Sequence, residues 1–280
     1  MSLSSYNVFK NHVSKTLKTI GLILFDIDGV IRDVTNSYRL SVQKTVLKYC
    51  NWEPSTYDID VLKNEGIWNN DWDLTLELIK RFINKNKLSL EPPSRNNIIN
   101  SFEKLYFGCN PNESHMKWSG FINNEKLLVN KNFFDFLNLN KIKWGFVSGA
   151  ELPSAKFILE NRLRLNNPPL IAMNDAPDKP NPEGFLKLAN KLLEKDFGPN
   201  CPPVAYVGDT IADIQTIINA KELYPSQRFI SIGVIPPHLK TAENFQKQSQ
   251  YESKLKAAGA DLIIKSVIDL KEIHKELFKA

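Results

Sequence analysis

The chain alternates between short apolar runs and longer segments in which apolar residues recur at helical spacing. The clearest run is Leu22 to Phe25. Four consecutive apolar residues are typical of a strand buried on both faces of a parallel sheet. Comparable runs predict five further strands, at residues 143–147, 170–173, 204–207, 229–234 and 262–264.

Helical patterns separate these runs in the second half of the chain. We expect helices at residues 133–137, 152–164, 182–195, 212–220 and 267–278. Regular alternation of strand and helix implies a parallel sheet with helices on both faces. The pattern therefore predicts an α/β fold with a Rossmann-like, three-layer parallel-sheet core.

The segment between the first and second predicted strands is different, because residues 36 to about 115 contain no convincing strand. It reads as consecutive helices, at 37–50, 58–64, 74–84 and 95–107. We therefore predict a core domain formed by residues 1–34 and 118–280, with a helical cap domain, residues 35–117, inserted after the first strand. Residues 1–20 are polar with scattered apolar positions, which fits either a short helix or a loose arm.

Composition narrows the choice of partner and compartment. The chain has 280 residues, 42% hydrophobic and 24% charged, with a net charge of +5, and no basic block indicates nucleic-acid binding. No apolar run approaches the roughly 20 residues that span a bilayer, and no secretory signal is visible. The three cysteines form no CxxC pair, which suits a reducing compartment. We expect a cytoplasmic protein without nucleic-acid or membrane partners.

Carboxylates follow two of the predicted strands. Asp26 and Asp28 come directly after the first strand, and Asp209 and Asp213 follow the strand at 204–207. Ligands of open α/β sheets bind beyond the carboxyl ends of the strands, so these acids are expected to meet at one crevice. Side-chain oxygens of Asp26 and Asp209 with the backbone carbonyl of Asp28 are the hard ligands that Mg²⁺ prefers. Carboxylates gathered at one crevice also repel one another unless a cation is present.

Hydrogen-bond donors follow two other strands. Ser148 and the backbone amide of Gly149 come after the strand at 143–147, and Lys179 lies between the next strand and its helix. Such donors suit phosphate oxygens. One aspartate can then attack phosphorus to form an acyl-phosphate while another moves protons. Each feature alone is commonly a turn, a solvated lysine or a helix start, but together they indicate phosphoryl transfer.

The motifs FDIDGV, VSG, DKPNPE and VGDTIAD stand in this order in the chain, which resembles the haloacid dehalogenase superfamily of phosphatases and phosphomutases. The inserted helices resemble the first cap class of that superfamily. The resemblance implies Asp26 as nucleophile, Asp28 as general acid/base, Ser148 and Lys179 as phosphoryl-binding residues, and Asp209 and Asp213 as metal ligand and support of the metal shell. Two departures are Val30, where threonine is common, and Pro236-Pro237-His238, where small flexible residues are more usual.

The resemblance leaves several activities open. The dehalogenases that name the superfamily lack the second aspartate, so Asp28 argues against that reaction. A phosphomutase would keep all four motifs. Phosphonate hydrolysis uses a cap lysine, for which Lys44, Lys48 and Lys63 are candidates, and a non-catalytic binding protein could use the same scaffold. We expect a Mg²⁺-dependent phosphatase that acts on a small phosphorylated metabolite through an aspartyl-phosphate, as a monomer or homodimer.

The cap segment from Gly66 to Trp72 is predicted to face the crevice and to bind the leaving group through Asn70, Asp71 and Trp72. It combines aromatic rings with amides and an acid and has no lysine or arginine, which suits a hydroxylated or sugar-like group. The alternative is structural: Trp68 and Trp72 pack the cap, and Asp71 or Asp73 caps the following helix.

Overall fold

The computed structural model describes residues 19–68 and 70–279 and contains a six-stranded parallel sheet with the order β5-β4-β1-β6-β7-β8. β1 (Gly21–Phe25) lies centrally and pairs with β4 on one side and β6 on the other. The predicted α/β, three-layer fold is confirmed. The remaining strands of the sheet are β4 (Ile142–Val147), β5 (Leu170–Ile171), β6 (Val204–Gly208), β7 (Phe229–Val234) and β8 (Leu262–Ile264).

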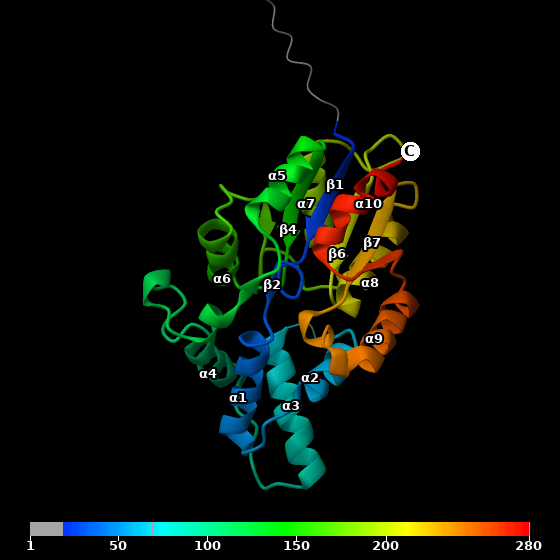
Figure 1. Cartoon of the computed structure of the whole chain (residues 1–280). Helices are drawn as coiled ribbons and strands as arrows, with labels where there is room; N and C mark the ends of the chain where they lie inside the picture. Colours follow the sequence, from blue (N-terminus) through cyan, green and yellow to red (C-terminus); the bar gives the residue numbers. More distant parts are fainter. Residues whose placement is uncertain (1–18, 69, 280) are drawn as a thin grey trace, which may run out of the picture.

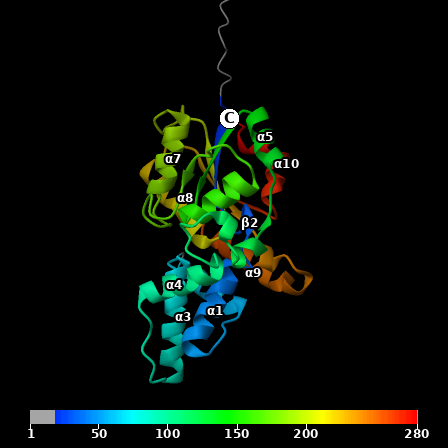
Figure 2. The same cartoon turned by 90° about the vertical axis from the view of Figure 1, so that its left-hand side faces the viewer.

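The two faces of the sheet are covered by different helices, which Figure 2 shows on opposite sides. Ile23 and Phe25 of β1 pack against α5 and α10, whereas Leu22 and Leu24 pack against α7 and α8. Successive side chains of a strand point to opposite faces, so an uninterrupted apolar run is what a strand between two helical layers requires. The helices of these layers are α5 (Lys131–Leu139), α7 (Glu183–Leu193), α8 (Ile211–Leu223) and α10 (Leu270–Leu277).

Four helices inserted after β1 pack together below the sheet, as Figure 1 shows. They enclose a hydrophobic cluster of their own, with Val42, Leu78 and Phe102 at its centre. We propose on this basis that residues 35–117 fold as the cap unit, although Trp118 and Ile122 extend the same cluster beyond that boundary. The inserted helices are α1 (Tyr38–Cys50), α2 (Thr56–Lys63), α3 (Asp71–Asn86) and α4 (Arg95–Tyr106).

Several element boundaries differ from the prediction. The helix expected at 152–164 is a short α6 (Leu152–Lys156) followed by a π-helix (Phe157–Arg162), and a two-residue ribbon pairs β2 (Arg32–Asp33) with β3 (Lys126–Leu127). The sequence pattern missed α9 (Phe245–Ala257). Only Tyr251 and Leu255 of that helix are buried, so its apolar periodicity is too weak to read.

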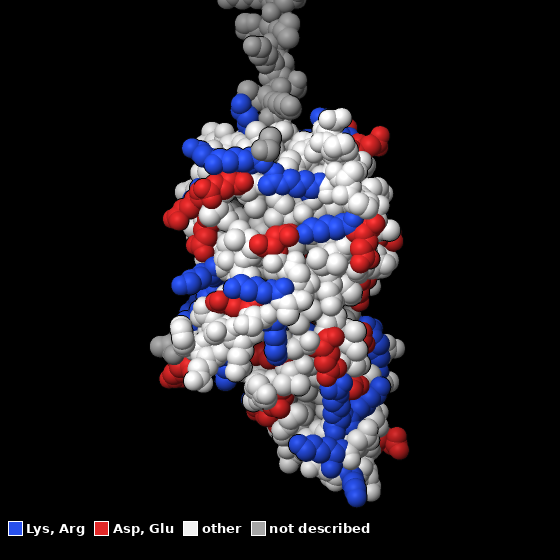
Figure 3. Space-filling model, turned by 90° about the vertical axis from the view of Figure 1, so that its right-hand side faces the viewer, with Lys and Arg blue, Asp and Glu red and all other residues white. Residues whose placement is uncertain are grey.

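On the face in Figure 3, basic and acidic side chains are interspersed, and no large patch carries charge of one sign only. Among the described residues, no helix has the length and apolar character needed to cross a membrane. The prediction of a short helix or arm at residues 1–20 falls almost wholly outside the described residues, which begin at 19.

Candidate active site

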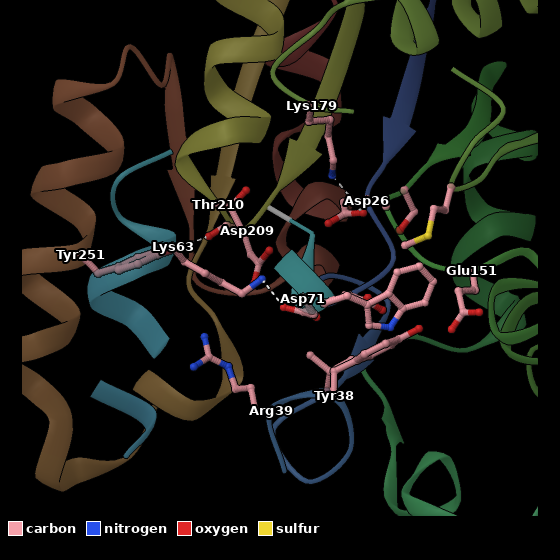
Figure 4. Close-up of a pocket in the computed structure, with 16 residues that line it drawn as sticks. Asp26, Tyr38, Arg39, Lys63, Asp71, Glu151, Lys179, Asp209, Thr210 and Tyr251 are labelled. Carbon is pink, nitrogen blue, oxygen red and sulfur yellow. Dashed lines mark hydrogen bonds and ion pairs between the residues drawn. The ribbon is translucent and has the colours of Figure 1, made fainter. Parts of the chain in front are cut away.

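Three adjacent strands end at one pocket. Asp26 follows β1, Ser148 and Gly149 follow β4, and Asp209 follows β6. Because β4, β1 and β6 are parallel neighbours, their carboxyl ends lie side by side, as the rule for open α/β sheets predicts. Lys179 enters the same pocket from the loop before α7 (Figure 4).

Asp26, Asp209 and Asp213 form an acidic group, because each offers a carboxylate oxygen within 4.8 Å of the others. Gly29, with φ +74°, permits this arrangement: a Cβ at that position would collide with the carboxylate of Asp209. The chain turns tightly after β1, and only a residue without a side chain lets Asp209 lie against the turn.

Burial makes this group electrostatically unfavourable without a cation. Desolvation raises the pKa of Asp26 to about 6, and the nearby charge of Lys179 opposes that rise. Burial and the neighbouring carboxylates of Asp213 and Asp26 also hold the pKa of Asp209 well above its usual range. Clustered oxygen donors whose ionisation is disfavoured in this way fit a hard divalent cation such as Mg²⁺.

Lys179 is buried between two of these acids. Its ammonium lies 2.5 Å from Asp213 and 3.2 Å from Asp26, and it also contacts the hydroxyl of Tyr206 at 3.2 Å. Burial lowers the pKa of Lys179, but Asp213 and Asp26 outweigh it and hold that pKa well above the usual value. Asp26 Oδ1 accepts no hydrogen bond of good geometry from any described residue, and the Lys179 ammonium lies 3.2 Å from this same oxygen.

Asp213 does more than contribute negative charge. It is the third residue of α8, where its Oδ2 accepts hydrogen bonds from the amide and hydroxyl of Thr210. Its Oδ1 contacts Lys179 and accepts a hydrogen bond from the Tyr206 hydroxyl. Both oxygens are therefore engaged, and the contacts favour a role in holding Lys179 and the start of α8.

Asp28 is fixed by a wholly buried arginine. Arg32 donates from Nε to Asp28 Oδ1 at 2.6 Å and from Nη1 to Glu125 at 3.0 Å. The same guanidinium donates to the Tyr106 hydroxyl of α4 and to Ser154 of α6. Arg32, two residues beyond the first motif, thus connects Asp28 to α4 of the insertion and to α6 of the core.

The predicted cap residues separate into two groups. Asp71 and Trp72 line the pocket, and Asp71 forms an ion pair with Lys63 at 2.8 Å. Asn70 is absent from the lining: its side-chain oxygen accepts hydrogen bonds from the amides of Trp72 and Asp73. Asn70, rather than Asp71 or Asp73, is the N-cap of α3, which corrects the start expected at residue 74. Trp68 donates to Glu65, and Asn69 lies outside the described residues.

The sequence pattern did not single out several residues that complete the pocket. Glu151 lies three residues after Ser148, so following the chain beyond the VSG motif would have found it. Thr210 directly follows Asp209 within the VGDTIAD motif and could have been found in the same way, whereas the others belong to no motif. These additional lining residues are Val34, Tyr38, Arg39, Met173, Thr210 and Tyr251.

The loop after β7 contacts helix α2 of the insertion. His238 contacts the Asp60 carboxylate at 3.1 Å, and Arg39 pairs with the same carboxylate at 2.7 Å. Pro237 to Leu239 forms a 3₁₀ turn that places this histidine against α2. The unusual Pro-Pro-His sequence therefore has a structural role at the junction of core and insertion.

Part of the chain is similar in sequence to proteins of a known family. Residues 127–221 match the sequence model of the haloacid dehalogenase-like hydrolases. The predicted resemblance to the haloacid dehalogenase-like hydrolases is confirmed. The chain is also 31% identical over 194 residues to a Phytophthora nicotianae protein named imidazoleglycerol-phosphate dehydratase; the match covers 69% of this chain but only 40% of that relative, so the chain spans less than half of its length.

Solved structures agree on the fold of this chain. A phosphonoacetaldehyde hydrolase-like protein from Oleispira antarctica superposes with a TM-score of 0.65 at 17% identity, covering 99% of this chain and 97% of the other. A hydrolase from Pseudomonas syringae gives 0.63 at 16% identity, covering 93% and 99%. Identities this low establish the shared fold, insertion included, and leave the substrate open.

Proposed function

We propose that this protein is a Mg²⁺-dependent phosphatase that hydrolyses a small phosphorylated metabolite through an aspartyl-phosphate on Asp26. The observation that carries the proposal is the position of Asp26. Its Oδ1 accepts no hydrogen bond from the described residues, yet lies 3.2 Å from the Lys179 ammonium. A carboxylate oxygen free to attack, beside a cation that stabilises charge on the transferring group, is what nucleophilic phosphoryl transfer requires.

In the proposed reaction, different residues of the pocket bind the phosphoryl group, attack phosphorus and transfer protons. Ser148, the Gly149 amide and Lys179 bind the phosphoryl oxygens while Asp26 attacks phosphorus and the ester P–O bond breaks. Asp28 gives its proton to the departing alkoxide, then takes one from the water that hydrolyses the acyl-phosphate. Arg32 holds Oδ1 of Asp28, which leaves Oδ2 to carry this proton. Asp26, Asp209 and the Asp28 carbonyl would hold Mg²⁺, with Asp213 in support, and the ion would neutralise charge on the phosphoryl oxygens.

Substitution of the two aspartates tests this assignment. Asp26→Asn should abolish turnover because an amide does not attack phosphorus, and Asp28→Asn should lower kcat about 10²–10⁴-fold. Beryllofluoride should form an adduct on Asp26 of the wild-type protein and none on Asp26→Asn. The nucleophile assignment fails if Asp26→Asn retains near wild-type activity, and full activity in EDTA would remove the metal from the proposal.

A phosphonate hydrolase is a second candidate, because Lys63 of the insertion lines the pocket. The other two lysines considered lie elsewhere: Lys44 pairs with Glu53 and Lys48 contacts Ser101. A lysine that forms a Schiff base must reach the carbonyl carbon of the substrate, and the Lys63 ammonium is instead held 2.8 Å from the Asp71 carboxylate. Borohydride inactivation in the presence of an aldehyde phosphonate, lost in Lys63→Arg, would favour this candidate over the phosphatase.

A phosphomutase or a non-catalytic binding protein would give different results in one substrate panel. Release of inorganic phosphate supports a phosphatase, isomerised sugar phosphate supports a mutase, and binding without turnover supports a binding protein. The panel should include phosphate esters that carry an imidazole, since the Phytophthora relative is named for one. The dehydratase name itself belongs to that longer protein.

A further inference from the structure

The cations of the pocket are already paired. Lys179 contacts Asp213 and Asp26, Lys63 pairs with Asp71 at 2.8 Å, and Arg39 pairs with Asp60 at 2.7 Å. Figure 4 shows Lys63 and Arg39 on the side of Tyr251, with Glu151 on the opposite side, beyond Asp71. The two sides of the pocket therefore differ in charge.

Glu151 has no cation of its own. Of the acids that line the pocket outside the metal-binding group, Asp28 pairs with Arg32 and Asp71 with Lys63, whereas Glu151 forms no ion pair with any described residue. Its Oε2 is buried and accepts no hydrogen bond within the described chain. A buried carboxyl oxygen without a partner is costly, and its position in the pocket makes a ligand the natural partner.

A second acid, Glu103, lies close enough to Glu151 to affect its ionisation. Burial, together with the neighbouring negative charge of Glu103 from α4, raises the pKa of Glu151 to about 8. The other groups that face the carboxyl are Arg32 of β2, which opposes this rise, and the Tyr38 hydroxyl of α1. Arg32 is engaged with Asp28 and Glu125, so Glu151 lines this side of the pocket without an ion-pair partner among the described residues.

We propose that Glu151 binds a positively charged nitrogen on the leaving group, so that the substrates are phosphate monoesters of amino or imidazole-bearing alcohols. The inference rests on the proposed phosphatase function and narrows its substrate class. A leaving group with a positively charged nitrogen differs from the hydroxylated or sugar-like group that residues 66–72 led us to expect. That expectation considered the insertion alone, whereas Glu151 belongs to the core.

Matched pairs of substrates test the proposal. Aminoalkyl phosphates of two to four carbons are compared with alkyl phosphates in which methyl replaces the ammonium group. For wild type, kcat/KM should be at least about tenfold higher for the best aminoalkyl ester. Glu151→Gln should lower kcat/KM for the aminoalkyl ester much more than for the alkyl ester and so remove this preference. Glu53→Gln, which alters an exposed acid paired with Lys44, is the matched control and should change neither.

The pH dependence gives a second readout. A cation binds the ionised carboxylate, so the ratio of aminoalkyl to alkyl kcat/KM should increase as the pH rises through about 8. Taking the ratio cancels the titration of Asp26 and of the phosphate group. In Glu151→Gln the ratio should stay constant from pH 6 to 9.

Two failures can be told apart. Wild-type turnover of both esters with no preference, or equal effects of Glu151→Gln on both, would overturn the subsite and leave the phosphatase standing. No turnover of any ester would overturn the phosphatase, and binding then decides the subsite by calorimetry on Asp26→Asn. Aminoalkyl phosphate should bind about tenfold more tightly than its alkyl partner, and Asp26→Asn/Glu151→Gln should lose the difference; equal affinities would reject the subsite.

Discussion

Arg32 and Asp28 are joined by a hydrogen bond of 2.6 Å between Nε and Oδ1, with the guanidinium wholly buried. They lie four residues apart on either side of the tight turn that follows β1. Because Arg32 also contacts Glu125 and Tyr106, the orientation of the proposed general acid depends on residues about 75 to 95 positions along the chain.

The first prediction concerns this buried pair. Arg32→Met should destabilise the protein by about 3–5 kcal/mol, because Glu125 would remain buried without its cation. Unfolding in urea measures this loss. Adding Glu125→Gln should recover a large part of the stability, since it removes the uncompensated charge. Turnover should stay low in the double variant, because Asp28 still lacks its partner; normal turnover would show that Arg32 is structural only.

The second prediction concerns magnesium and pH. The pKa of Asp26 is raised from 3.8 to about 6, so the metal-free fold loses stability as the pH rises between these two values and bears the full cost of the ionised group above about 6. Mg²⁺ relieves that cost and must compete with the proton at lower pH. Millimolar Mg²⁺ should therefore raise Tm more at pH 7.5 than at pH 5. Asp209→Asn should abolish the shift, and an equal shift at both pH values would contradict the assigned site.

The third prediction separates the two roles of Lys179. Lys179→Ala should weaken phosphate binding and slow attack, and it should also lower Tm because Asp213 loses its buried cation. Asp213→Asn in the same protein should restore much of the Tm without restoring activity. Recovery of both together would mean that Lys179 acts only through stability.

The fourth prediction concerns the cap of α3. Asn70→Ala should cost about 1 kcal/mol, since it removes an N-cap acceptor, and Asn70→Ser should recover most of it. Turnover of the best substrate and of p-nitrophenyl phosphate should change in parallel, because Asn70 lies outside the pocket lining. A selective loss on the best substrate would instead return Asn70 to the substrate-binding residues.

The sequence by itself predicted the strands that end at the site and the fold class. Leu22 to Phe25 reads as a doubly buried strand because burial on both faces demands apolar residues at every position. Asp26, Ser148, Lys179 and Asp209 could be expected to meet because the carboxyl ends of parallel strands share one edge. Whether a polar residue follows directly after a strand can be read from the sequence itself, because it depends only on neighbouring residues.

Tertiary structure decided what surrounds those residues. How the inserted helices pack on the core decides the pairing of Arg32 with Asp28 and Glu125 and the capping role of Asn70. It also leaves Glu151 without an ion-pair partner among the described residues. Side chains from α1, α4 and α6 meet there across large separations in the chain. Such contacts leave no periodic signal, because hydrophobic patterning specifies which face of a helix is buried and not which polar group that face meets.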